Sequence, residues 1–413
     1  MKLIHFSDLH IGVENYGRID PETGMSTRLL DFLHAYDQLV DYAISNKVDA
    51  VLFAGDAYKS RDPSQTHQRE FASRVARLAS EGIPVLLVTG NHDMPSVASK
   101  ASALEIFPTL VVENVVVSDQ VETTTIHTRD GALQVVSLPW VRRSNFLSKE
   151  ETRELNLDEI SEAITKRLTS IVNSELDNLD PSVPAVLVGH VTVMGAKVGT
   201  ERSMMLGRDH TLLPSALKHP NLDYVALGHI HKHQVIGHDP MVVYSGSMQR
   251  VDFSEETEAK GFCVVDLSLQ RKDGSRLVNF EFQSVEARPF LTIDVEVKTT
   301  DEDPNVPILA AISSKYVSGS TVRLRIKVPE DIEGSIKESV LREALREAHY
   351  VAGISKEVIR PQRTRLAPEV SKGLSSRDAL KLYLDTRDFS KSRIDILLTE
   401  ADNLINEELE GPG

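Results

Sequence analysis

The sequence predicts an α/β protein built on layered sheets, and three observations lead to this prediction. Short apolar runs of four or five residues recur along the N-terminal half, and most of them lead into a glycine. Stretches with helical periodicity separate the early runs, and His, Asp or Asn residues follow directly after them. Buried strands that alternate with amphipathic helices are typical of a sheet whose outer faces are covered by helices.

The apolar runs indicate buried strands, because a strand covered on both faces carries apolar side chains without alternation. The runs that lead into polar clusters are residues 3–6, 50–54, 85–88, 185–188 and 224–227. Further strands are expected within 111–139, which has a turn at Asp130-Gly131, and at 241–244, 261–267 and 277–282. Helices are expected over residues 27–46, 63–80 and 156–179.

The pattern changes near Arg288-Pro289. Alternating strands at 291–297 and 322–328 and an amphipathic helix at 335–348 predict a small α+β unit. A Pro-rich, basic connector at 361–368 precedes two amphipathic helices, at 376–384 and 391–409. These helices either pack on their own domain or bind a partner, and the residues alone favour neither. We therefore expect three domains, at 1–285, 286–360 and 361–413.

Composition limits the class of protein. The chain has 413 residues and a net charge of −15, so long-range repulsion should make DNA binding by this chain alone weak and salt-sensitive. The single cysteine, Cys263, cannot form an intramolecular disulfide, so nothing indicates an oxidising compartment. No apolar run is long enough to span a bilayer, and the first residues do not resemble a signal peptide. We expect a cytoplasmic protein without membrane association.

Five strand ends carry candidate metal ligands. Taken singly, each has an ordinary explanation: an aspartate after glycine forms turns, and an asparagine caps helices. Taken together, the strand ends should meet at one edge of the sheet. Burying so many polar groups there costs free energy unless a favourable interaction offsets the loss of hydration, and binding of metal ions provides that interaction. The candidate residues are Asp8, His10, Asp56, Asn91, His92, His190, His229 and His231.

The residue types narrow the metal and the reaction. No cysteine lies near these clusters, and imidazole, carboxylate and amide ligands suit Mn, Fe, Zn or Co, with Mn fitting octahedral ligation well. Without His92, the candidates are seven ligands, a number that suits two ions sharing one carboxylate. Two metal ions in this arrangement hydrolyse phosphate esters. His92 would protonate the leaving oxygen, with Asp93 orienting it. The alternative for His92 is a further metal ligand.

These clusters resemble the calcineurin-like metallophosphoesterase pattern D-x-H, G-D, G-N-H-D, G-H and G-H-x-H. All five blocks are present in this order, beginning at Asp8, Gly55, Gly90, Gly189 and Gly228. The resemblance implies a β-sandwich flanked by helices.

A finer resemblance is to the SbcD family, the nuclease subunits of bacterial SbcCD complexes. The segments similar to that family are residues 4–12, 228–232, 244–247, 253–255 and 260–262. The resemblance implies a small α+β capping domain after the catalytic domain, followed by C-terminal helices that bind an SMC-like ATPase of the SbcC type. It also implies a homodimer, through helices at 63–80 and 95–106.

The resemblance implies the roles of the site residues as well. The implied activities are Mn-dependent 3'-5' exonuclease action on duplex DNA and endonuclease action on single strands and hairpins. His92 would be the catalytic histidine that binds no metal. Some relatives have a second histidine where this chain has Lys59, which leaves that auxiliary role in doubt. One Mn²⁺ would take Asp8, His10, Asp56 and His231, and the other Asp56, Asn91, His190 and His229, although other divalent cations fit.

Two other functions are compatible with the same residues. A small-molecule phosphoesterase acting on a cyclic nucleotide or a phosphomonoester would share the fold and the site. The chain beyond Val285, which a minimal phosphoesterase does not need, disfavours this alternative. A scaffold without catalytic turnover is disfavoured because all the key side chains are present.

Overall fold

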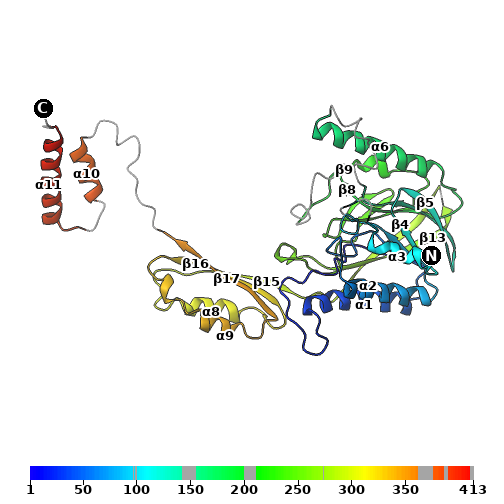
Figure 1. Ribbon diagram of the computed structural model, residues 1–413, viewed down its shortest axis with the longest axis horizontal. Coiled ribbons are helices and arrows are strands. Elements are labelled where there is room, and N and C mark those ends of the chain that lie inside the picture. The colour runs from blue at the N-terminus through cyan, green and yellow to red at the C-terminus, as the bar shows by residue number, and fades with distance from the viewer. Residues whose placement is uncertain are drawn as a thin grey trace.

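The computed structural model describes residues 1–95, 97, 100–141, 155–199, 211–272, 274–360, 375–385 and 389–409. Figure 1 shows a two-sheet body that carries the N-terminus, a smaller lobe with a third sheet, and a helical pair near the C-terminus. The body stacks its two sheets between helices, so the predicted α/β class is confirmed. Within the described ranges, none of the helices combines the length and apolar character that a bilayer span requires.

The first sheet is mixed and has the strand order β14-β13-β1-β2-β3-β4. Strands β1 to β4 are parallel, whereas β13 runs antiparallel to both β1 and β14. The carboxyl ends of β1, β2 and β3 therefore lie at one edge. The strands are β1 (Lys2–Phe6), β2 (Ala50–Phe53), β3 (Val85–Val88), β4 (Val115–Ser118), β13 (Gly261–Lys272) and β14 (Ser275–Ser284).

The second sheet has the order β11-β12-β10-β7-β6-β5. Its central strands β6, β7, β10 and β12 are parallel, and the β5–β6 hairpin turns at the predicted Asp130-Gly131. The strands are β5 (Glu122–Thr128), β6 (Gly131–Leu138), β7 (Ala185–His190), β10 (Tyr224–Gly228), β11 (Gln234–His238) and β12 (Met241–Tyr244). A small two-stranded sheet, β8 (Thr192–Val193) with β9 (Thr211–Leu212), follows β7.

The two sheets pack face to face around an apolar core to which β2 contributes Leu52 and β7 contributes Val188. Helices α1 (Thr27–Ser45) and α2 (Gln65–Ser80) cover the outer face of the first sheet. Helix α6 (Leu157–Asp177) covers the outer face of the second. Each helix begins at a residue whose side chain accepts a backbone N–H of the first helical turn. These residues are Ser26, Ser64 and Asn156 respectively.

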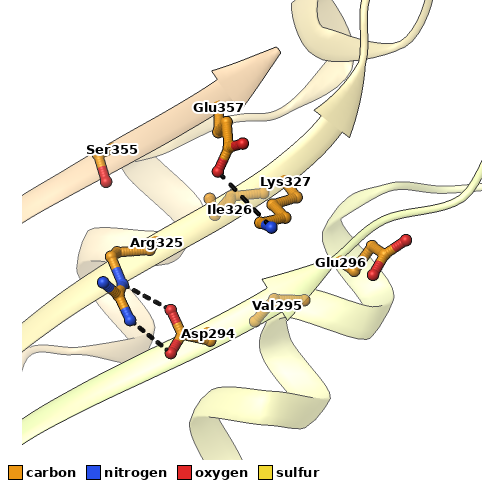
Figure 2. Close-up of a pocket in the computed structure, with 8 residues that line it drawn as sticks. All are labelled: Asp294, Val295, Glu296, Arg325, Ile326, Lys327, Ser355 and Glu357. Carbon is orange, nitrogen blue, oxygen red and sulfur yellow. Dashed lines mark hydrogen bonds and ion pairs between the residues drawn. The ribbon is translucent and has the colours of Figure 1, made fainter. Parts of the chain in front are cut away.

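The third sheet forms the smaller lobe. Its parallel strands are β15 (Phe290–Glu296), β16 (Thr321–Pro329) and β17 (Tyr350–Ile359). Helices α8 (Asn305–Ser313) and α9 (Glu338–Ala344) cover one face. The other face has a shallow pocket of about 620 Å³. Figure 2 shows the charged pairs that line this pocket. Arg325 lies 2.6 Å from Asp294, and Lys327 lies 3.9 Å from Glu357. These exposed pairs stabilise the lobe little.

Aromatic side chains join the lobe to the body. The ring of Tyr16, from the loop before α1, lies 5.8 Å from Phe290 and 6.0 Å from Tyr350. Phe253 from the body stacks edge-on against Phe290 at 4.9 Å, and the guanidinium of Arg323 lies over the Phe253 ring. The lobe therefore packs on the body through buried and partly buried rings as well as through the covalent connection.

The C-terminal helices α10 (Ser376–Asp385) and α11 (Lys391–Leu409) pack on each other. Their shared apolar residues are Leu380, Leu384, Ile394 and Leu398. The basic connector predicted at 361–368 lies outside the described residues.

Two expected helices differ in the structure. The helix expected at 335–348 is shorter, because α9 is preceded by a 3₁₀ turn at Glu333–Ser335. The helix expected at 95–106 is not formed in the part of that range that the structure describes; a 3₁₀ turn at Ala103–Glu105 leads into the single-turn α3 (Ile106–Thr109). Ser102 and Glu105 form a capping box, so the helical turns of this segment begin after Ser102.

Candidate metal centre

The candidate ligands follow parallel strands of both sheets, at the edge where their carboxyl ends meet. Asp8 and His10 follow β1, Asp56 follows β2, and Asn91 follows β3. The second sheet contributes the last residue of β7 and two residues just after β10, namely His190, His229 and His231. Ligand atoms within 4.8 Å of one another form three groups: Asp8, His10 and His231; His10, Asp56 and His92; and Asp56, His190 and His229.

The site bends the chain sharply after each strand. Asp8, His10, Asp56 and His229 all adopt positive φ, between 46° and 91°, a conformation that non-glycine residues rarely hold. Such strain concentrates at functional sites, where the surrounding structure enforces it. The four turns aim side chains from both sheets into one region.

Glycines before the ligands allow the strand ends to approach. A Cβ atom on Gly228 would lie 2.1 Å from the Ala54 carbonyl oxygen, and one on Gly90 would lie 2.1 Å from Asp56 Oδ1. Gly55 has φ +93°, and a Cβ there would meet His190 Nδ1 at 2.3 Å. Close contact between the two sheets therefore requires glycine at 55 and 228, and close contact between neighbouring loops of the first sheet requires it at 90.

In the first ligand group, two imidazole nitrogens face each other. His10 Nε2 lies 2.9 Å from His231 Nε2, while His231 Nδ1 lies 2.7 Å from Glu255 Oε1. Because the Glu255 carboxylate accepts the Nδ1 proton, His231 presents a lone pair at Nε2 when its ring is neutral. Burial lowers the pKa of His10 well below its usual range, so the His10 ring is neutral.

In the third group, which contains Asp56, His190 and His229, polar atoms converge with the side-chain oxygen of Asn91. His190 donates its Nδ1–H to the Ala54 carbonyl at 2.7 Å, so Nε2 presents a lone pair when the ring is neutral. That atom lies 3.0 Å from Asn91 Oδ1 and 3.3 Å from Asp56 Oδ2, and Asn91 Oδ1 lies 3.2 Å from His229 Nδ1. When His190 is neutral, these acceptors repel one another unless a cation lies among them.

The spacing of these atoms fits divalent cations. Neighbouring ligand atoms around an octahedral ion with bonds of about 2.1 Å lie roughly 3 Å apart. The contacts of 2.9 Å between His10 and His231 and 3.0 Å between His190 and Asn91 match this edge length. The residues present therefore fit a pair of metal ions, with nitrogen and oxygen ligands and no thiolate.

The charge balance also favours cations. Burial alone would lower the pKa of His190, but the Asp56 carboxylate raises it to about 9. Burial alone would raise the pKa of Asp56, but the charges of His190 and His92 hold it well below its usual range. The negative Asp56 thus holds a proton on His190 at neutral pH, and a metal ion that binds Nε2 must displace that proton.

His92 lies beside the ligands and is oriented by the backbone. Its Nδ1 donates to the Lys59 carbonyl at 2.8 Å, and its ring stands edge-on to His10 with centroids 5.1 Å apart. Its backbone N–H also donates to Asp56 Oδ1 at 2.8 Å. These contacts leave Nε2 as the atom available to a substrate or an ion.

Asp93 does not orient His92, which corrects the role that we expected for it. Its buried carboxylate accepts backbone N–H groups from Asp56, Ala57 and Gly90 at 2.8 to 2.9 Å. Burial and the nearby Asp56 charge raise the pKa of Asp93 to about 7. The turn after β3 points the two neighbouring side chains in different directions, so Asp93 holds the loop that carries Asp56.

Comparison with known proteins places the chain in a family. A sequence model described as calcineurin-like phosphoesterase matches residues 1–233, more than half of the chain. The chain belongs to the calcineurin-like phosphoesterase family. It is therefore a metal-dependent phosphoesterase, a hydrolase, and its strand-end residues are suited to two divalent cations.

Several relatives within the calcineurin-like phosphoesterases carry a more specific name. The chain is 25% identical over 332 residues to the SbcD subunit of nuclease SbcCD from Escherichia coli K12, covering 73% of this chain and 79% of that protein. It is 24% identical over 301 residues to the protein of the same name from Staphylococcus epidermidis, covering 71% and 72%. A solved dimetal phosphatase from Danio rerio aligns with 67% of this chain and 98% of its own, at 11% identity and a TM-score of 0.38.

Three residues of this calcineurin-like site were missed by the sequence analysis. Glu255 and Lys260 lie in the two segments, 253–255 and 260–262, that resembled a known family but had no role. The ring of Trp140, two residues after β6, lies 5.0 Å from His229. Its position just beyond a strand at the ligand edge was the available signal.

Proposed function

We propose that this chain is the nuclease subunit of an SbcCD-type DNA repair complex. It would act as a Mn-dependent 3'-5' exonuclease on duplex DNA and as an endonuclease on single strands and hairpins. One observation carries the proposal. The strand ends bear a complete cluster of candidate ligands, and the chain matches most of the length of relatives that are named as the SbcD subunit of nuclease SbcCD.

The proposed ligand sets divide the cluster between two ions. One set is Asp8, His10, Asp56 and His231, and the other is Asp56, Asn91, His190 and His229. Asp56 suits the bridging position, because its Oδ2 lies 3.8 Å from His10 Nε2 and 3.3 Å from His190 Nε2. Mixed imidazole, carboxylate and amide ligation supports Mn²⁺, while other divalent cations remain compatible.

The chain's own groups supply the remaining chemistry. When bound, the two ions would activate water and neutralise the phosphoryl oxygens of the scissile phosphodiester. His92 would give its Nε2 proton to the leaving oxygen from the imidazolium form, in which both ring nitrogens carry a proton, and the Lys59 carbonyl would hold the ring in position by accepting the Nδ1–H throughout. The Lys59 side chain is half-buried, and burial lowers its pKa, although the Asp56 charge opposes this effect. We assign it phosphate binding and no proton transfer.

The domain and partner assignments belong to the same proposal. Residues 1–285 would form the nuclease domain, 286–360 the capping domain, and 361–413 the element that binds an SMC-like ATPase. A homodimer would form through the 63–80 segment, which contains α2, since the second helix expected at 95–106 is not formed in its described part.

The substrate class is tested with purified full-length protein and Mn²⁺. We expect linear duplex DNA to be degraded and cyclic nucleotides to be hydrolysed slowly or not at all. The measurement is release of acid-soluble nucleotides from end-labelled duplex, compared with hydrolysis of a cyclic mononucleotide at equal enzyme concentration. Rapid cyclic-nucleotide hydrolysis without action on any DNA would support a small-molecule phosphoesterase and refute the nuclease proposal.

The C-terminal helices present apolar side chains that their mutual packing leaves uncovered. Leu397 is 39% exposed and Leu404 is 63% exposed, and their spacing of seven residues places them on one side of α11. An amphipathic helix with such a stripe is suited to a groove on a partner.

Deletion of residues 376–413 should abolish binding to an SMC-like coiled-coil ATPase but spare Mn-dependent cleavage of single-stranded DNA. The Leu397→Asp/Leu404→Asp variant should weaken ATPase binding as well, because it makes the exposed stripe polar and leaves the contact between the helices intact. Co-purification with the ATPase measures both effects. Asp395→Asn is the matched control, because Asp395 is exposed on the opposite side of the same helix. Undiminished binding by the deletion variant would refute the role of these helices.

A further inference from the structure

Glu255 is a buried carboxylate that contacts one of the proposed ligands. It is 2% exposed and ends a 3₁₀ turn at Phe253–Glu255, in which Asp252 caps the first residues. Its Oε1 accepts the Nδ1 proton of His231 at 2.7 Å, and its Oε2 accepts the Val251 N–H at 3.0 Å. Both oxygens of this buried carboxylate are therefore hydrogen-bonded, one of them to the imidazole of His231.

Lys260 supplies the charge that Glu255 needs. It is 2% exposed, and its Nζ lies 2.7 Å from Glu255 Oε2. The same ammonium donates to Ser247 Oγ at 2.8 Å and to the His231 carbonyl at 3.2 Å. A buried ion pair persists only when its remaining hydrogen-bonding groups are satisfied, and these oxygens satisfy the ammonium. Lys260 thus contacts both Glu255 and the backbone of the residue that Glu255 orients.

The proposed ligand histidines are not held alike. His190 donates its second ring proton to a neutral acceptor, the Ala54 carbonyl. His231 instead donates to the charged Glu255. A carboxylate behind a metal-ligating imidazole fixes its tautomer and makes the ligating nitrogen more basic, and loss of such a partner typically weakens metal binding 10- to 100-fold.

We propose that Glu255 and Lys260 form a positioning pair that strengthens metal binding by His231 and so makes the Asp8, His10 and His231 site the tighter of the two. Glu255 keeps the His231 proton on Nδ1 and the lone pair on Nε2, toward His10. Lys260 places its ammonium 2.7 Å from the other Glu255 oxygen, Oε2, and holds the carboxylate in place. This role presupposes the proposed ligation by His231 but is independent of which phosphodiester is cleaved.

The test is Mn²⁺ binding to metal-free, full-length protein by isothermal titration calorimetry. Wild type should bind two ions, and Glu255→Gln should bind one of them about 10- to 100-fold more weakly. Because a lone Lys260 charge would destabilise that variant, Glu255→Gln/Lys260→Met removes both charges together. The double variant should melt close to wild type without metal and still show the weakened site.

Glu258→Gln is the matched control, since Glu258 also pairs with Lys260, at 2.9 Å, and none of its contacts in the described structure is with His231. It should bind both ions as wild type does. Wild-type affinity for both ions in Glu255→Gln/Lys260→Met would overturn the positioning role, and so would equal weakening in Glu258→Gln. Failure of wild type to bind any Mn²⁺ would instead overturn the ligand assignment.

Discussion

Asp56→Asn should abolish Mn-dependent DNA cleavage, with a loss of about 10³-fold or more in kcat. Asp56 Oδ2 lies within 4 Å of one imidazole nitrogen from each proposed ligand set, His10 Nε2 and His190 Nε2. Its charge is therefore the one that the two proposed metal sites share. An amide in its place removes that charge and cannot bridge two cations with equivalent oxygens. Metal content measured after gel filtration should fall below the two ions expected for wild type. The metal content and kcat should fall together.

Asp62→Asn is the matched control for this variant. Asp62 is exposed and pairs with Lys100 at 3.2 Å, so its loss should change neither metal content nor stability by much. Retention of two ions and near-normal cleavage by Asp56→Asn would show that another group bridges the ions. Asp56→Asn should also lower the pKa of His190 from about 9, because the Asp56 charge opposes the effect of burial there.

His92→Ala should reduce kcat for DNA cleavage by about 10²- to 10⁴-fold while leaving both ions bound. The side chain is half-buried beside the ligands, and its Nδ1 is held by the Lys59 carbonyl at 2.8 Å. Removing it takes away the proposed proton donor but no member of the two proposed ligand sets. The combination of normal Mn²⁺ stoichiometry with lost turnover separates proton transfer from metal binding.

His34→Ala is the matched control for His92, since His34 is an exposed histidine on α1 that lies 3.4 Å from Glu286. It should cleave DNA at the wild-type rate. Loss of a bound ion in His92→Ala would support the alternative that His92 is a metal ligand. An unchanged kcat would remove it from the mechanism.

The apolar periodicity was sufficient to predict most strands and the three long helices of the body. Helix α1 was expected at 27–46 and is found at Thr27–Ser45, because its apolar stripe and the Ser26 cap are local signals. Strand β11 at Gln234–His238 was missed, since its residues are only partly buried and carry no apolar run. The helix expected at 95–106 shows the opposite error: it was implied by the family resemblance, whereas the described part of this range begins a helical turn only at the Ser102 cap.

Spacing in the sequence also indicated which residues would gather at the site, but not what holds them. The D-x-H and G-H-x-H blocks place polar residues directly after strands, and this placement does not depend on the tertiary contacts of the chain. Asp93 is next to His92 in the sequence, yet its carboxylate accepts backbone N–H groups. The group that orients His92 is a carbonyl 33 residues away. Hydrogen-bond partners depend on which loops meet, and motif spacing does not contain that information.

By itself, the sequence determined that strand ends bearing His, Asp and Asn would converge in an α/β fold, because strand direction and burial follow from local composition. The tertiary structure decided which nitrogen of each histidine is available to a metal. For His231 that decision comes from Glu255, 24 residues further along, and from the buried Lys260 beside it. The physical reason is that a tautomer is chosen by the acceptor facing the other ring nitrogen, and only the packing of distant segments brings that acceptor into place.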